Sequence, residues 1–141
     1  MEVVNGYWIQ GGFTSENAGF CKWAIAEKEG RQYFIKEFLS PKFPSSDSGL
    51  SPTTVAKKKS ECERFYSQKA KLYREIQKCR TGNVVIVHDF FRDGSKYYAV
   101  AERIAAQSFT PPEIAALPPE KKLTLIRSIL YSFSEIHSRS I

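Results

Sequence analysis

The stretch Arg31-Gln-Tyr-Phe-Ile-Lys-Glu-Phe-Leu39 decides the expected fold. It is rich in aromatic and β-branched residues, which favour a strand, and Lys36 lies near its end. A turn that ends in Gly30 precedes it, and an apolar segment at 19–26 precedes that turn. A shorter apolar segment lies at 7–10. We therefore expect three strands joined by short connections, forming an antiparallel meander.

A long helix is expected in the middle of the chain. Residues 40–51 are rich in proline and serine and predict a loop, while Ser51-Pro52 is typical of a capped helix start. The helix is expected to continue to about Cys79 and to end before Gly82. Its apolar stripe is formed by Phe65, Leu72 and Ile76.

Two further strands and a helical region complete the expected fold. A buried strand is predicted at 84–87, a hairpin turn at 92–96 and a strand at 97–104. After a proline-rich connection, a last helix is expected from Pro118. The expected fold class is α+β, a five-stranded antiparallel sheet with a long inserted helix, followed by C-terminal helices.

Composition places limits on the function. The chain has 141 residues, 42% of them hydrophobic, and a formal net charge of +6. The basic residues are dispersed apart from Lys57-Lys58-Lys59, which favours a solvated helix face over a nucleic-acid patch. No apolar run approaches the roughly 20 residues of a membrane helix. Three widely spaced cysteines favour reduced thiols, so we expect a cytoplasmic protein without nucleic-acid or membrane partners.

Three motifs in this order resemble a protein kinase domain of the serine/threonine type, bacterial-like. They are Tyr33-Phe-Ile-Lys36, the segment Glu102-Arg-Ile104, and the ending Ile136-His-Ser-Arg-Ser-Ile141. The resemblance implies that residues 1–105 form a kinase-like N-lobe, and that 106–141 form the linker and first helices of a truncated C-lobe. The chain is then expected to stop before the loop that holds the catalytic aspartate and the metal ligands.

The resemblance also implies a set of ATP-binding residues. Lys36 would position the phosphates, and Glu61 is one option for its ion-pair partner on the long helix. That pair is otherwise missing, because the position counted from the family falls on Gln68 or Lys69, and Lys69 facing Lys36 would be repulsive. The remaining cofactor-binding residues would form the glycine loop, the roof, the rear and the hinge of the site: Gly11, Gly12, Gly19, Cys21, Phe34, Ala101, Glu102 and Ile104.

Several functions stay open at this level. In the first, the complete protein transfers the γ-phosphate of ATP to Ser/Thr hydroxyls of a protein substrate, with Mg²⁺ bound in the full-length domain, and this fragment is inactive. In the second, the chain is a pseudokinase or scaffold that binds a regulatory protein, because Phe34 replaces the small residue that roofs the adenine in the family. A nucleic-acid platform of Trp8, Phe20 and Trp23 ranks last. A structural lysine at the end of a strand is the plain alternative for Lys36. Self-association through the bare apolar stripe of the last helix is a further prediction.

Overall fold

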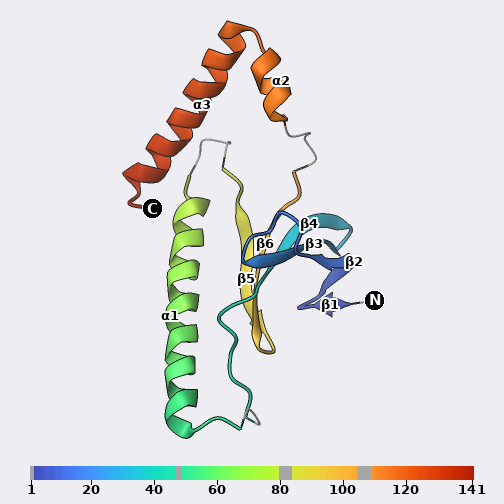
Figure 1. The fold of residues 1–141 in the computed structure, drawn as a ribbon, viewed down its shortest axis with the longest axis vertical. Coiled ribbons are helices and arrows are strands. Elements are labelled where there is room, and N and C mark those ends of the chain that lie inside the picture. The colour runs from blue at the N-terminus through green and yellow to red at the C-terminus, as the bar shows by residue number, and fades with distance from the viewer. Residues whose placement is uncertain (1, 47–48, 80–83, 105–108) are drawn as a thin grey trace.

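The computed structural model describes residues 2–46, 49–79, 84–104 and 109–141. The sheet contains β1 (Val3–Val4), β2 (Tyr7–Thr14), β3 (Cys21–Lys28), β4 (Arg31–Phe38), β5 (Val87–Asp93) and β6 (Lys96–Glu102). The helices are α1 (Pro52–Gln77), α2 (Pro111–Ala116) and α3 (Pro119–Ser138). The strands are all antiparallel, in the order β1-β2-β3-β4-β6-β5, and the sheet curls into a half-barrel beside α1 (Figure 1).

The predicted fold class was wrong in its sheet. The described residues form six strands in a curled sheet, where five were expected, although the α+β class is retained. The additional strand arises because Asn5 and Gly6 adopt positive φ angles of 47° and 83°, which turn the chain back sharply. As a result Val3 pairs with Trp8 and Val4 pairs with Tyr7.

Strand β2 is longer than predicted because it contains a bulge. Gly11 and Gly12 have φ angles of 71° and 84°, and the pairing with β3 shifts register between Gln10 and Thr14. An extra residue in one strand bends and twists it, which contributes to the curl of the sheet. Phe13 consequently packs against the core on the concave side, with its ring 6.0 Å from that of Tyr98.

The concave side of the sheet holds the main core. Its buried members are Val4, Tyr7, Ile9, Ala24, Ala26, Ile35, Tyr98 and Val100. One carboxylate, that of Glu37, is buried there and is only 3% exposed. It accepts hydrogen bonds from Lys96 Nζ at 2.9 Å and from the Tyr98 hydroxyl at 3.1 Å. Both bonds offset the cost of burying this charge.

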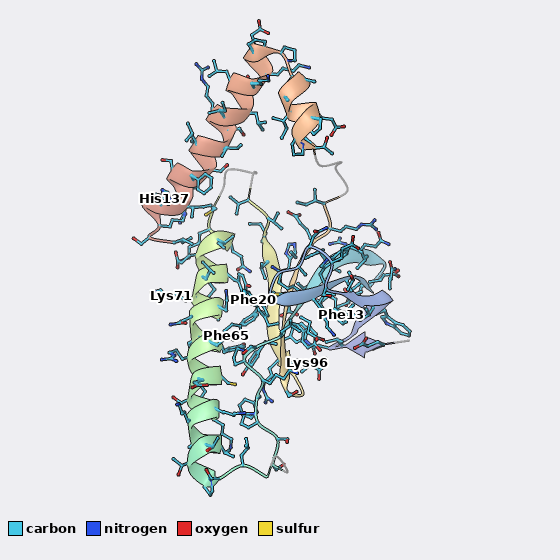
Figure 2. All side chains as sticks on the ribbon, viewed as in Figure 1. Phe13, Phe20, Phe65, Lys71, Lys96 and His137 are labelled. Atoms are coloured by element: carbon cyan, nitrogen blue, oxygen red, sulfur yellow. The ribbon has the colours of Figure 1, made fainter. Side chains whose placement is uncertain are left out.

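Helix α1 begins where the sequence predicted. The Ser51 side chain accepts a hydrogen bond from the Thr54 amide at 3.2 Å, and Pro52 occupies the first turn. One side of α1 packs on the sheet through a second cluster containing Phe38, Cys62, Tyr97 and Ala99, with Phe65 against it. Figure 2 shows Phe65 on the side of α1 that faces the sheet and Lys71 on its outer side.

The C-terminal part differs from the prediction in detail. Strand β5 starts at Val87, so the segment expected as a buried strand at 84–87 lies almost wholly before it, and Val85 is 43% exposed. Helices α2 and α3 lie beyond one end of the sheet (Figure 1). The predicted domain boundary at residue 105 and the helix stop at Gly82 fall outside the described residues. No helix in the described part of the chain is both long and apolar enough to cross a bilayer.

Candidate functional site

Lys36 lies on β4, between β3 and β6 in the sheet. It pairs with Trp23 on one side and with Ala99 on the other. The side chain is half-buried, and its ammonium group makes no hydrogen bond or ion pair to any residue that the structure describes. A lysine held on a central strand without an anionic partner is available to an external anion.

The two faces of β4 are packed differently. Ile35 and Glu37 point to the concave core and are 0% and 3% exposed. Phe34 and Lys36, which alternate with them, lie on the opposite face and are half-buried. We call this second face, defined by Trp23 of β3 and by Phe34 and Lys36 of β4, the open face. Helix α1 covers the part of this face that holds Phe38 and Ala99, whereas Trp23, Phe34 and Lys36 are only partly covered.

An aromatic pair lies next to Lys36 on the open face. The rings of Trp23 and Phe34 stack with centroids 5.5 Å apart and an interplanar angle of 23°. Phe34 pairs across the sheet with Ala101, which is buried and small. The resemblance implies a small roof residue at position 34, and Phe34 places an aromatic ring there instead. Together the two rings form a flat apolar surface beside the ammonium group.

The glycines of the predicted loop do not act as a unit. Gly11 and Gly12 belong to β2 and form its bulge, so only residues 15–20 form the hairpin tip between β2 and β3. Gly19 has a φ of 60° in this tip, a conformation that favours glycine. Thr14 is the last residue of β2 and pairs with Trp23, so the tip begins one residue after the strand partner of Trp23.

Cys21 is placed nearer to α1 than to the aromatic pair. It lies opposite Phe38 in the sheet and packs against the α1 cluster. Burial raises the pKa of the neighbouring Tyr73 hydroxyl on α1, and Cys21 contributes to the rise. Cys21, Cys62 and Cys79 are all free thiols.

Helix α1 does not bring a carboxylate to Lys36. Glu61 is exposed, while its neighbour Cys62 is fully buried against the sheet. No ion pair joins Glu61 and Lys36 in the described structure. Instead Lys69 lies over the rings of Phe38 and Phe65, with its Nζ 5.7 Å and 5.9 Å from their centroids. The role given to Glu61 thus stays a prediction.

The predicted hinge residues lie at the end of β6, where Glu102 is the last residue of the strand. Ala101 is buried, whereas Glu102 and Ile104 are exposed. Between them, Arg103 donates a hydrogen bond to the side chain of Gln32. Backbone groups of an exposed segment at a strand end can pair with a flat polar ligand, and the side chains of these residues do not decide whether they do.

Sequence reasoning missed a row of polar side chains on the open face. Gln10 donates to Glu27 at 3.1 Å and accepts from Gln32 at 3.3 Å, and Arg103 joins the row through Gln32. The open face therefore changes from polar at the hinge, through the aromatic pair, to the cation of Lys36. The Glu29-Gly30 turn fixes the pairing of β3 with β4, so the contact of Trp23 with Lys36 could have been read from the sequence.

The concave face holds tyrosines that remain protonated. Burial, followed by the Asp89 carboxylate, raises the pKa of Tyr7 to about 12. The Tyr7 hydroxyl donates to Asp89 at 3.3 Å. Burial and the Glu37 carboxylate also raise the pKa of Tyr98. These groups serve as hydrogen-bond donors in the core and lie on the side of the sheet opposite to Lys36.

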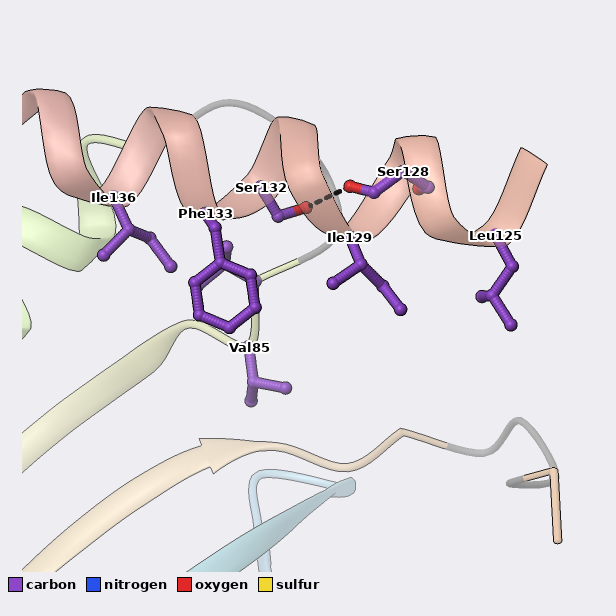
Figure 3. A pocket seen from close by; sticks show the side chains of 8 residues that line it. Val85, Leu125, Ser128, Ile129, Ser132, Phe133 and Ile136 are labelled. Atoms are coloured by element: carbon purple, nitrogen blue, oxygen red, sulfur yellow. Dashed lines mark hydrogen bonds between the residues drawn. The ribbon is translucent and has the colours of Figure 1, made fainter. Parts of the chain in front are cut away.

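Two cavities lie outside the immediate surroundings of Lys36. One, of about 700 Å³, adjoins the bulge and is lined by Trp8, Gln10, Gly11, Gly12, Glu27 and neighbours. The other, of about 480 Å³, lies between α3 and residues 84–85 (Figure 3). Figure 3 shows Leu125, Ile129, Phe133 and Ile136 projecting from α3 toward Val85, and Ser132 donating to the Ser128 carbonyl.

No known family model and no curated protein matches this chain. The described residues also contain no group of three or more His, Cys, Asp or Glu side chains that could hold a metal ion. The open face is the candidate site, because a cation, an aromatic pair and a row of polar side chains follow one another along it.

Proposed function

We propose that this chain is the nucleotide-binding lobe of a serine/threonine-type protein kinase. In the full-length protein, the γ-phosphate of ATP is transferred to hydroxyl groups of a protein substrate, while this part alone is inactive. The observation that carries the proposal is the ammonium group of Lys36, which has no partner among the described residues and is held on a central strand beside a stacked aromatic pair.

The chemistry of phosphoryl transfer explains why such a lysine is useful. Catalysis consists mainly of positioning the phosphates and stabilising their negative charge, so a fixed cation contributes without any covalent step. Lys36 is fixed because both neighbouring strands pair with β4 at its position. Phe34 and Trp23 offer a surface for the nucleobase, and exposed backbone at Glu102 and Ile104 offers hydrogen bonds to its edge. Mg²⁺ would be held by residues other than those described here.

The remaining partners follow from this proposal. A protein that carries Ser/Thr hydroxyls is the substrate, and a cytoplasmic location supplies both this substrate and ATP. Three free cysteines in the described structure are compatible with a reducing compartment.

A second candidate is a pseudokinase or scaffold that acts by binding another protein. Two observations favour it. The Phe34 ring occupies the roof of the site, stacked on Trp23. In addition, Lys69 of α1 lies over the rings of Phe38 and Phe65, and no ion pair joins Lys36 to a carboxylate among the described residues. A site of this kind that rejects ATP would retain the fold and lose the transferase function.

Titration calorimetry with ATP, with and without Mg²⁺, tests the proposal. Lys36→Met is expected to weaken binding by at least about tenfold, because a charged hydrogen bond contributes about 1.5–3 kcal/mol. Lys22→Met is the matched control, since Lys22 lies on β3 opposite Glu37 and therefore on the other face of the sheet. Equal losses in both variants would contradict a specific role for Lys36.

Phe34→Ala separates the two candidates. If the Phe34 ring blocks the base, its removal is expected to create or strengthen ATP binding that still requires Lys36. If wild type and Phe34→Ala both fail to bind ATP while remaining folded, the scaffold function is favoured.

A further inference from the structure

The indole of Trp23 connects two parts of the candidate site. Its Nε1 donates a hydrogen bond to the backbone carbonyl of Glu16 at 2.8 Å. Glu16 belongs to the hairpin tip, residues 15–20, whereas the ring of Trp23 stacks on Phe34 of β4. Trp23 is also the strand partner of Lys36. The side chain of Trp23 thus contacts both the tip and Phe34, and the backbone of Trp23 pairs with β4 at Lys36.

The other hydrogen bonds near the middle of the tip are local. The Glu16 amide donates to the Thr14 hydroxyl at 3.2 Å, and the Ala18 amide donates to the Ser15 carbonyl at 3.2 Å. Such bonds fix the shape of a turn, yet they do not determine how it lies on the sheet. At the far end of the tip, the Phe20 carbonyl accepts a hydrogen bond from the Leu39 amide at 3.4 Å, while the Phe20 side chain is 91% exposed. That bond holds the end of the tip beside β4, and it leaves the middle of the tip to the indole of Trp23.

We propose that Trp23 is a positioning residue that holds the hairpin tip against the open face, next to Lys36. The Phe34 ring fixes the plane of the indole, and this plane sets the direction in which the N–H donates. Held in this way, the tip keeps its backbone amides close to a polyphosphate bound by Lys36. The identity of this anion rests on the proposed function, but the tethering of the tip does not.

Trp23→Phe is the first variant to measure, because it keeps an aromatic ring on Phe34 and removes the donor. Trp8→Phe is its matched control. Trp8 lies on β2 and is 53% exposed, and its indole forms no hydrogen bond within the described structure. Circular dichroism and thermal melting establish that both variants are folded.

Hydrogen–deuterium exchange of residues 15–20 in the ligand-free chain tests the tether directly. Loss of one hydrogen bond is expected to speed exchange of the tip by about five- to tenfold in Trp23→Phe, with no change in Trp8→Phe. Chymotrypsin cleavage after Phe20 is expected to accelerate in parallel. Equal exchange in wild type and Trp23→Phe would overturn the proposal. If Trp23→Phe does not fold, Phe34→Leu serves instead, since it keeps the donor but removes the stack, and faster tip exchange is again expected.

Binding of inorganic triphosphate distinguishes positioning from stacking. This probe has no base, so a Trp23 that only supports a nucleobase would leave its affinity unchanged in Trp23→Phe. A positioning role predicts about a three- to tenfold weaker affinity for triphosphate and for ATP alike. An unchanged triphosphate affinity would overturn the positioning role. If wild type binds neither probe, the proposed function fails, and the exchange measurement alone decides the tether.

Discussion

The concave face of the sheet and helix α3 carry equally clear apolar patterns, yet they are packed very differently. Ile35 and Val100 on the concave face are fully buried, because neighbouring strands supply apolar partners. On α3, Leu130 is 62% exposed and Phe133 is 53% exposed. An apolar stripe therefore indicates a surface that needs a partner, and the described residues provide that partner for the sheet but not for all of α3.

The largest expected effect comes from removing a core side chain. Ile35→Ala should lower the free energy of unfolding by about 2–5 kcal/mol, because Ile35 is 0% exposed and its truncation leaves a cavity in the core. Leu130→Ala should change it by about 0.5 kcal/mol or less, because Leu130 is largely exposed. Urea denaturation followed by tryptophan fluorescence measures both. Similar losses in the two variants would show that α3 is packed as tightly as the sheet.

A smaller effect is expected from the ion pairs of the two regions. Lys96→Met removes one of the two donors to the buried Glu37 carboxylate and should cost about 2 kcal/mol. Arg139→Met removes the solvent-accessible pair with Glu135 near the end of α3, and its effect should be too small to resolve. The same denaturation measurement applies. A loss in Arg139→Met as large as that in Lys96→Met would remove the distinction.

Self-association tests what covers the exposed stripe of α3. We expect the chain to associate through this stripe, and Leu130→Lys to weaken the association about tenfold, or about 1.4 kcal/mol. Thr124→Lys is the control, because Thr124 lies on the opposite side of α3 and is also exposed. Sedimentation velocity over a concentration series provides the measurement. A wild-type chain that stays monomeric throughout would contradict this prediction.

The last expected effect is a pH dependence of stability that arises in the core and is confined to strongly alkaline solution. The folded pKa of Tyr7 is raised from 10.0 to about 12, so the folded state holds this proton more tightly than the unfolded state. Its contribution to stability is therefore complete below pH 10 and is lost as the pH rises toward about 12. In Tyr7→Phe, the free energy of unfolding should fall less steeply between pH 10.0 and about 12 than it does in the wild type. Tyr131→Phe, at a residue 64% exposed on α3, should leave the slope unchanged.

Local signals accounted for many elements but not for the number of strands. The Ser51-Pro52 helix start and the Glu29-Gly30 turn could be predicted because each acts over a few residues. Strand β1 was missed because two residues have no periodicity, although the Asn5-Gly6 pair is a known hairpin signal. In β2, Gly11-Gly12 was interpreted as part of a loop, whereas the pairing with β3 makes it a bulge.

The candidate site was predictable to a similar extent. Lys36 was singled out through the resemblance carried by Tyr33-Phe-Ile-Lys36, and its strand was predicted well. The position of Glu61 relative to Lys36 could not be predicted from the sequence. It depends on the rotation of α1 about its axis and on where α1 packs along the sheet. The row from Gln10 to Arg103 was missed because its members come from distant strands.

The amino-acid sequence by itself determined which segments form strands and helices, and which side of each is apolar, because these properties arise from neighbouring residues. The tertiary structure alone decided that Trp23 reaches the carbonyl of Glu16, that Phe34 stacks on Trp23, and that the ammonium group of Lys36 has no described partner. Those features depend on the curl of the sheet and on the packing of α1, where groups distant in the chain compete for the same space.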